Sequence, residues 1–189
     1  MNTPSLINTA RVMVASDKGL LAMDESNPTC NKRFAQWGIP QDEETRRAYR
    51  ELIVTTPGLG ESISGAILYD ETIRQKKKDG TLIVQSLIDA GIIPGIKVDT
   101  DAKEMAGHAG EKVTEGLDGP RDRLAEYFQM GARFAKWRAV MAVGDGIPSQ
   151  APSLIVSMPL SDEKPLFGLH VSNMVSDRNV CRADLRIHE

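Results

Sequence analysis

The sequence has few cysteines and no long hydrophobic run. Its 189 residues include two cysteines, Cys30 and Cys181, and they lack the paired spacing of a zinc or redox site. This count excludes a disulfide scaffold and predicts reduced thiols in a cytosol-like compartment. No stretch approaches the roughly 18–20 apolar residues that a membrane-spanning helix needs. The segment that begins at Met1 also lacks the basic and apolar regions of a secretory signal. We therefore expect a cytoplasmic protein without a membrane partner.

The sequence has no strong excess of positive or negative charge, and it has no metal-binding motif. Its 23 basic and 26 acidic side chains give a net charge of -3, and the one dense basic run, Lys76–Lys78, leads into an Asp-Gly turn. This balance predicts no nucleic-acid partner. The histidines His108, His170 and His188 share no ligand or triad spacing, so we interpret them as solvated or incidental. No His/Asp/Glu cluster has metal-ligand spacing, and we expect neither a metal nor a cofactor.

Short apolar runs alternate with segments of helical periodicity along the chain. The runs span 19–24, 64–69, 94–99 and 134–140, and helices are predicted over 29–37, 42–52, 81–90 and 121–130. Between the last two runs lies a Gly-rich polar stretch in which no strand is predicted. Near-continuous apolar strands separated by helices are typical of a parallel sheet, and the crossovers are long enough for βαβ units. The sequence therefore predicts an α/β fold.

Charged residues occur at or near the ends of these predicted strands. They are Asp24, Lys97, Asp99, Lys136 and Arg138. A lysine in an apolar strand must be paired, have a lowered pKa, or extend along the strand end to solvent. A (β/α)8 barrel places catalytic residues at these ends. A doubly wound sheet would do the same but usually carries a Gly-rich loop after its first strand, and none is present. Carboxylate, ammonium and guanidinium groups together suit a small phosphorylated substrate.

Six motifs in order carry a resemblance to a known family. They are LLAMDESNPTCNKRFAQWGI, ETRRAYRELIVTTPGLG, ISGAILYDET, GIIPGIKVD, EGLDGPRDR and GARFAKWRAV. From Lys18 to Ser149 the chain resembles class I fructose-bisphosphate aldolase, and the AMDESN form is similar to the plastid and cyanobacterial branch. The resemblance implies a (β/α)8 TIM barrel, of which residues 1–150 would supply about the first four βα units. It also implies a homo-oligomer that cleaves fructose 1,6-bisphosphate reversibly to dihydroxyacetone phosphate and glyceraldehyde 3-phosphate, without a cofactor, in the bacterial cytosol or the plastid stroma.

The resemblance also implies roles for individual residues. Two match catalytic positions: Asp24, which orients the amine and shuttles protons, and Lys136, which is placed for proton transfer. The residues that match substrate-binding positions are Ser26, Thr29, Arg33, Arg46, Lys97 and Arg138. Thr29 replaces a more usual serine, and Pro28 is a departure from the family. We interpret Trp37 as core packing rather than as a stacking surface, whereas Trp137 fits either the core or the barrel mouth.

The family's imine-forming lysine has no match in this chain. In such enzymes this lysine lies on the sixth strand and a pair of glutamates on the fifth, and the protonated imine is the electron sink for C–C cleavage. After Ser149 the family pattern stops, and the only later lysine, Lys164, lies in a polar turn before a proline. We expect residues 151–189 to be foreign to the family, either disordered or the product of a frameshift.

These observations predict a truncated protein without turnover. Four strands form an open half barrel with exposed edges, so the fragment is expected to aggregate, to pair with a second copy or to pack loosely. Two alternatives remain open. One is a non-catalytic fragment that binds sugar phosphates or associates with other chains through its open edge. The other is a different barrel enzyme that acts on phosphorylated sugars.

Overall fold

The structure is a computed structural model that describes residues 6–15, 17–116, 119–140, 142, 144–147, 149 and 168–174. These residues divide into two compact units. The first contains the described residues up to Lys97 together with Arg121–Ala135. The second contains those of Val98–Pro120 and most of those from Lys136 onward. Each unit is therefore considered by itself.

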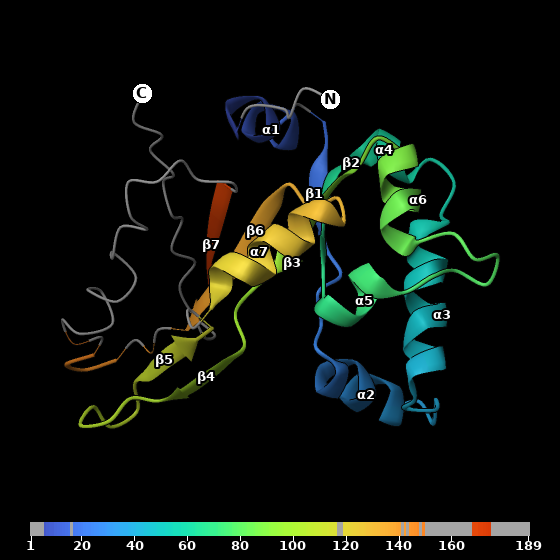
Figure 1. Ribbon diagram of the computed structural model, residues 1–189. Coiled ribbons are helices and arrows are strands. Elements are labelled where there is room, and N and C mark those ends of the chain that lie inside the picture. The colour runs from blue at the N-terminus through green and yellow to red at the C-terminus, as the bar shows by residue number, and fades with distance from the viewer. Residues whose placement is uncertain are drawn as a thin grey trace. The chain divides into compact units, whose positions relative to one another are not determined.

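A parallel sheet forms the centre of the first unit (Figure 1). Its strands are β1 (Gly19–Ala22), β2 (Ile63–Leu68) and β3 (Ile93–Lys97). The strand order continues with β6 (Phe134–Val140), which starts in this unit, and β7 (Gly168–Met174). Ala22 lies opposite Ile67, and Ile67 lies opposite Gly95. The predicted parallel sheet is confirmed, and β2, buried over most of its length, is the apolar strand such a sheet requires.

Helices follow the strands in the order expected of βα units. They are α1 (Leu6–Met13), α2 (Asn27–Ala35), α3 (Glu43–Val54), α4 (Leu59–Ser62), α5 (Asp70–Arg74), α6 (Ile83–Asp89) and α7 (Pro120–Gln129). The four predicted helices correspond to α2, α3, α6 and α7, with ends shifted by a few residues. Helix α6 packs against α3, α5 and β3 (Figure 1). The short helices α1, α4 and α5 were not among the predicted elements.

The ring of Phe134 lies against two strand glycines, Gly95 in β3 and Gly65 in β2. Phe134 is buried, and a Cβ atom on Gly95 would come within 2.3 Å of its ring. A Cβ on Gly65 would lie 3.3 Å from the same ring and 2.9 Å from Cδ2 of Leu20. Because a Cβ cannot approach an aromatic carbon that closely without displacement, the glycines in SGAIL and PGIK leave the space that the ring fills.

A cluster of charged and aromatic side chains joins α5 to α7. Arg74 donates to Glu126 at 2.6 Å and to Asp70 at 2.9 Å, and Asp70 accepts the hydroxyl of Tyr127 at 2.9 Å. Burial, together with the hydrogen bond to Asp70, raises the pKa of Tyr127 to about 12. The cluster fixes the start of α5, directly after β2, against the C-terminal half of α7.

Trp37 does not lie in the core, and the prediction that it does is wrong. Its side chain is 82% exposed. The prediction required one helix to carry both Phe34 and Trp37 on one face. Helix α2 ends at Ala35, and Gly38 takes a left-handed conformation with a φ of 65°, so Trp37 lies in the turn beyond the helix. Phe34 alone is buried, with its ring edge-to-face against Tyr49 at 5.6 Å.

The second unit contains an antiparallel hairpin in the stretch where no strand was predicted. Strands β4 (Asp101–Glu104) and β5 (Lys112–Glu115) pair, with Asp101 opposite Glu115. Most of their side chains are charged or polar and exposed, so the strands carry no apolar run for sequence analysis to detect.

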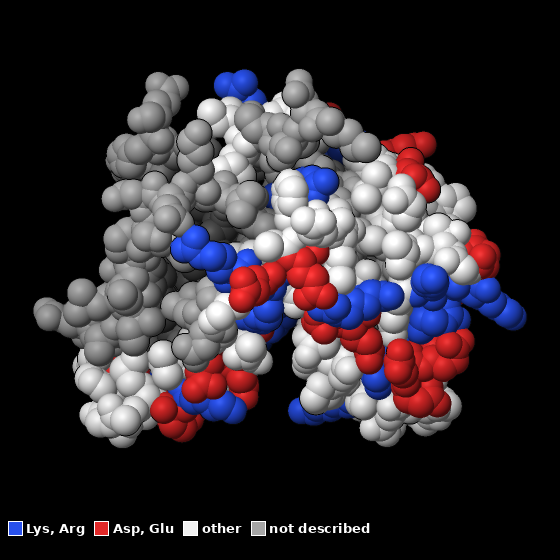
Figure 2. Space-filling view, in the orientation of Figure 1, with Lys and Arg blue, Asp and Glu red and all other residues white. Residues whose placement is uncertain are grey.

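Charged side chains of both signs are mixed on the surface. Figure 2 shows Lys and Arg interleaved with Asp and Glu on the face that it draws, without a field of one sign. Within the described ranges, no helix combines the length and the apolar character needed to cross a bilayer. Most of the tail, with Lys164, Cys181 and His188, lies outside the described residues, and β7 is described by its backbone alone.

Candidate functional site

Two of the predicted site residues lie at the C-terminal ends of strands in the first unit. Asp24 is buried and follows β1 by two residues, although its strand was predicted to include it. Lys97 is the last residue of β3 and is half-buried. In parallel α/β folds this end of a strand is where ligand-binding side chains project. Both residues interact with other groups of the protein.

Lys136 and Arg138 lie on β6 in the second unit. They are internal to the strand rather than at its end, and both are half-buried. The backbone N–H of Arg138 donates to the carboxylate of buried Asp99 at 3.2 Å. That these two residues converge with Asp24 and Lys97 stays a prediction. Trp137 between them is half-buried, which leaves its two interpretations open.

The start of helix α2 presents two hydroxyl groups. Ser26 occupies the N-cap position in extended conformation, but its side chain makes no capping bond. Its Oγ lies 3.0 Å from Oγ1 of Thr29, and this contact is exposed. Pro28 in the first turn lacks an N–H group and does not disturb the helix there. Hydroxyl groups and free N–H groups at a helix N-terminus favour an anionic ligand.

Arg33, one turn further along α2, is held by a carboxylate. Its Nη1 forms an ion pair with Oε1 of Glu25, the residue between Asp24 and Ser26. The side chain of Arg33 is 59% exposed, whereas that of Glu25 is 14% exposed. Arg33 therefore reaches solvent on the same helix whose start carries these hydroxyls.

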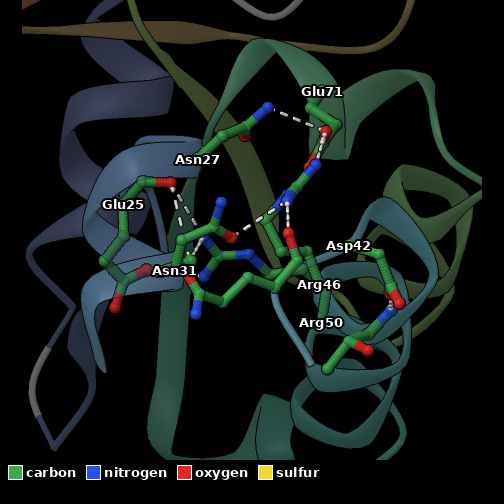
Figure 3. A network of polar contacts seen from close by, with 10 residues as sticks. Glu25, Asn27, Asn31, Asp42, Arg46, Arg50 and Glu71 are labelled. Atoms are coloured by element: carbon green, nitrogen blue, oxygen red, sulfur yellow. Dashed lines mark hydrogen bonds and ion pairs between the residues drawn. The ribbon is translucent and has the colours of Figure 1, made fainter. Parts of the chain in front are cut away.

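Arg46 is engaged in a network that joins three helices (Figure 3). Its guanidinium forms two parallel bonds of 2.8 Å to Glu71 of α5. It also donates to Oδ1 of Asn31 at 3.0 Å and to the carbonyl of Gln41 at 3.2 Å. Asn27 donates to the same Glu71 carboxylate at 2.8 Å. The network ties the first turns of α2 to α3 and α5, and the bonds to Glu71 raise the pKa of Arg46.

Sequence analysis missed the residues that hold this region together, namely Glu25, Arg50, Asn27, Asn31 and Glu71. Glu25 lies in the DES motif, but the resemblance gave roles only to Asp24 and Ser26 on either side of it. Arg50 lies one turn after Arg46, a spacing that puts both arginines on one face of a helix. A buried arginine predicts a buried acid, although sequence alone does not say which acid.

His108, predicted to be solvated or incidental, is 37% exposed but belongs to a cluster in the second unit. Its Nδ1 lies 3.3 Å from the carboxylate of Glu111 and 3.1 Å from Oγ of Ser149. Glu111 is buried and accepts the backbone N–H of Ser149 at 2.6 Å, which lowers the pKa of its carboxyl group. Carboxylate and hydroxyl meet the same imidazole nitrogen, whereas a catalytic triad uses opposite nitrogens. The cluster therefore joins the β4–β5 connection to Ser149.

The described residues contain no group of three or more His, Cys, Asp or Glu side chains placed to hold a metal ion. The candidate residues comprise basic side chains, hydroxyl groups and the buried carboxylate of Asp24. This combination suits an anionic, hydroxylated ligand.

Comparisons with known proteins agree with this chemistry. The model of a family described as fructose-bisphosphate aldolase class-I matches residues 5–160, a range wider than Lys18 to Ser149 at both ends. The chain is 60% identical over 149 residues to a probable fructose-bisphosphate aldolase class 1 of Xanthomonas campestris pv. campestris, covering 79% of this chain and 45% of that protein. It is 51% identical over 141 residues to fructose-bisphosphate aldolase 3, chloroplastic, of Arabidopsis thaliana, covering 75% of this chain and 36% of that protein.

A solved structure is also similar. It is the fructose-bisphosphate aldolase of Plasmodium falciparum in a ternary co-crystal with TRAP and a small-molecule inhibitor. The TM-score is 0.76 at 44% sequence identity, and the match covers 78% of this chain and 43% of that one. The chain spans less than half the length of the relatives that it matches.

Proposed function

The chain belongs to the class I fructose-bisphosphate aldolase family, and from this membership we propose that it forms part of an enzyme that cleaves fructose 1,6-bisphosphate reversibly to dihydroxyacetone phosphate and glyceraldehyde 3-phosphate. The observation that carries the proposal is the family match across the segments that contain Asp24, Lys97 and Lys136. The relatives are bacterial and chloroplastic, so we place the protein in the bacterial cytosol or the plastid stroma.

The residues divide into two proposed roles. Asp24 and Lys136 act on protons near the bond that breaks, the roles that the resemblance implies for these positions; Asp24 is buried and Lys136 is half-buried. The resemblance implies substrate contacts for Ser26, Thr29, Arg33, Arg46, Lys97 and Arg138. Of the two candidate arginines in the first unit, Arg33 is the more accessible, since Arg46 already holds Glu71, Asn31 and Gln41.

These 189 residues bind sugar phosphate but do not turn it over. The lysine that forms the imine in class I aldolases has no match among them. Residues that only bind and orient the substrate cannot replace the covalent electron sink that this lysine provides. The first half of the barrel therefore supplies substrate contacts, and the remaining half supplies the nucleophile.

The test separates binding from covalent chemistry. Fructose 1,6-bisphosphate is titrated into the chain by isothermal calorimetry, with unphosphorylated fructose as the control ligand. Saturable binding of the bisphosphate alone is expected, and absence of binding would refute the proposal for this chain. Separately, incubation with dihydroxyacetone phosphate and borohydride followed by mass spectrometry is expected to give no adduct. A trapped adduct on a lysine would show that the chain does contain a nucleophile.

One observation favours a second role, association with another chain. Strand β1 lies at one end of the described sheet, and Leu20 on it is 37% exposed. An unpaired strand edge favours pairing with a further strand. Sedimentation of the chain over a range of concentrations tests this role, since a monomer at all concentrations would exclude self-association.

A further inference from the structure

Arg50 is a buried charge that the proposed reaction does not use. Its residue is 1% exposed, and it is the largest of the fully buried side chains in the described part of the protein. Burying a guanidinium costs several kcal/mol of solvation free energy unless an acid and hydrogen-bond acceptors compensate it. Its partners therefore show what the burial achieves.

The hydrogen bonds of Arg50 go to the segment from Glu25 to Cys30, and Figure 3 shows Arg50 and Glu25. Nη1 donates to Oε2 of Glu25 at 2.6 Å, and Nη2 donates to the backbone carbonyl of Glu25 at 3.0 Å. Nη2 also lies 3.4 Å from Sγ of Cys30, and the guanidinium lies 5.1 Å from the ring centroid of Tyr49. Arg50 thus holds both the side chain and the main chain of Glu25, the residue that separates Asp24 from Ser26.

The second carboxylate oxygen of Glu25 contacts an exposed arginine, Arg33. Oε1 forms the ion pair with Nη1 of Arg33. Burial opposes the charged form of Glu25, but the hydrogen bond and charge of Arg50, together with a backbone hydrogen bond and the charge of Arg33, keep the pKa of the carboxyl group below its usual value. Glu25 therefore stays a carboxylate between two arginines, one buried and one exposed.

The ion pair uses only one nitrogen of Arg33. Among the described residues, Nε and Nη2 of Arg33 make no further hydrogen bond. A guanidinium has five N–H donors in a fixed plane, so a contact through Nη1 leaves an edge that can bind phosphate with two bonds. Holding a long side chain before the ligand arrives reduces the entropy lost on binding.

We propose that Arg50 and Glu25 are positioning residues that orient Arg33 and the Asp24–Ser26 segment for a phosphate group of the sugar substrate. The inference rests on the proposed function, because that function supplies the phosphorylated ligand. The opposite effect is also physically possible: a carboxylate beside Arg33 can compete with phosphate for it. Removing the Glu25 carboxylate weakens phosphate binding if Glu25 orients Arg33 and strengthens it if Glu25 competes with phosphate, so substitution of Glu25 decides between them.

The first experiment measures affinity for fructose 1,6-bisphosphate in the 189-residue chain by calorimetry. Glu25→Gln and Arg50→Lys are each expected to weaken binding about tenfold. Arg47→Lys is the matched control, because Arg47 lies on the same helix and pairs with Glu44 and Glu51 but not with Glu25. It is expected to leave affinity unchanged. Tighter binding in Glu25→Gln, or an equal loss in all three variants, would overturn the proposal.

A double-substitution cycle distinguishes positioning from a merely structural role. If Glu25 acts through Arg33, Glu25→Gln has no further effect on affinity in the Arg33→Gln background. A general loss of structure would weaken binding equally in both backgrounds, and this outcome would contradict the proposal.

The second experiment needs no ligand. Nuclear magnetic resonance relaxation of the Arg33 Nε–H group reports the order of that side chain on the picosecond–nanosecond scale. The group is expected to be ordered in the unsubstituted chain and in Arg47→Lys, and mobile in Glu25→Gln and Arg50→Lys. Equal mobility in all four proteins refutes the positioning role even if the bisphosphate does not bind. Failure to bind with the expected relaxation pattern refutes only the proposed function.

Discussion

Arg33 and Arg46 carry the same guanidinium group in two different environments. Arg33 is mostly exposed and has one carboxylate partner, whereas the side chain of Arg46 is 11% exposed and has three acceptor residues. A group whose donors are already satisfied contributes mainly to stability, and one with available donors contributes mainly to binding. The two arginines therefore fit different duties, although both were predicted to contact phosphate.

Lysine substitutions separate these duties. Arg46→Lys is expected to lower the free energy of unfolding by about 2 kcal/mol, because an ammonium cannot replace the paired bonds to Glu71. Arg33→Lys is expected to change it by less than about 0.5 kcal/mol, since that side chain is mostly exposed, but to weaken fructose 1,6-bisphosphate binding about tenfold. Urea denaturation and calorimetry measure the two effects. A loss of affinity in Arg46→Lys without a loss of stability would show that Arg46 contacts the ligand directly.

At the scale of elements, the contact between β3 and the start of β6 depends on the absence of a side chain. Gly95 lies beneath the ring of Phe134, and the backbone N–H of Arg133 donates to the carbonyl of Pro94 at 2.8 Å. The ring and the hydrogen bond bring the two strands together at the point where the sheet passes from β3 to β6.

Gly95→Ala tests this contact. The added Cβ overlaps the buried ring of Phe134, so the substitution is expected to lower the free energy of unfolding by about 2 kcal/mol. Phe134→Leu in the same protein is expected to restore part of the loss, because the smaller side chain vacates the space. Gly19→Ala in β1 is the control, since nothing lies within 4 Å of its Cβ. Urea denaturation measures all three variants, and a neutral Gly95→Ala would contradict the packing argument.

At the scale of the whole molecule, the chain spans less than half of its relatives, and β1 has β2 as its only neighbour among the described strands. A barrel satisfies both edges of its sheet by closing on itself. The remaining half of such a barrel is therefore the natural partner for the β1 edge, and under the proposed function it supplies the imine-forming lysine.

Complementation tests this expectation. The chain is mixed with the part of the Xanthomonas campestris relative that follows the matched segment, and cleavage of fructose 1,6-bisphosphate is followed in a coupled assay. Activity is expected in the mixture but in neither component alone. Asp24→Asn is expected to abolish activity without preventing association, whereas Leu20→Lys on β1 is expected to weaken association. An associated but inactive mixture would contradict the proposed division of residues between the two halves.

The sequence alone determined the alternation of strands and helices and the family. Apolar periodicity is a local property, so the runs at 64–69 and 134–140 and the four main helices were predictable from residues close together in the chain. The same reasoning failed where the signal was weak or ended early. The polar hairpin β4–β5 has no apolar run, and the exposed Trp37 follows a helix end that the Phe34–Trp37 spacing did not reveal.

Only the tertiary structure decided which charges meet. Glu25 and Arg50 are 25 residues apart, as are Arg46 and Glu71, and no periodicity relates such distant residues. Pairing of a buried charge depends on which side chains the fold encloses together, because desolvation makes an unpaired charge costly only in the folded state. The sequence thus supplied the candidate phosphate-binding residues, and the fold decided that Arg33 reaches solvent, that Arg46 is held within the network, and that Arg50 lies buried against Glu25.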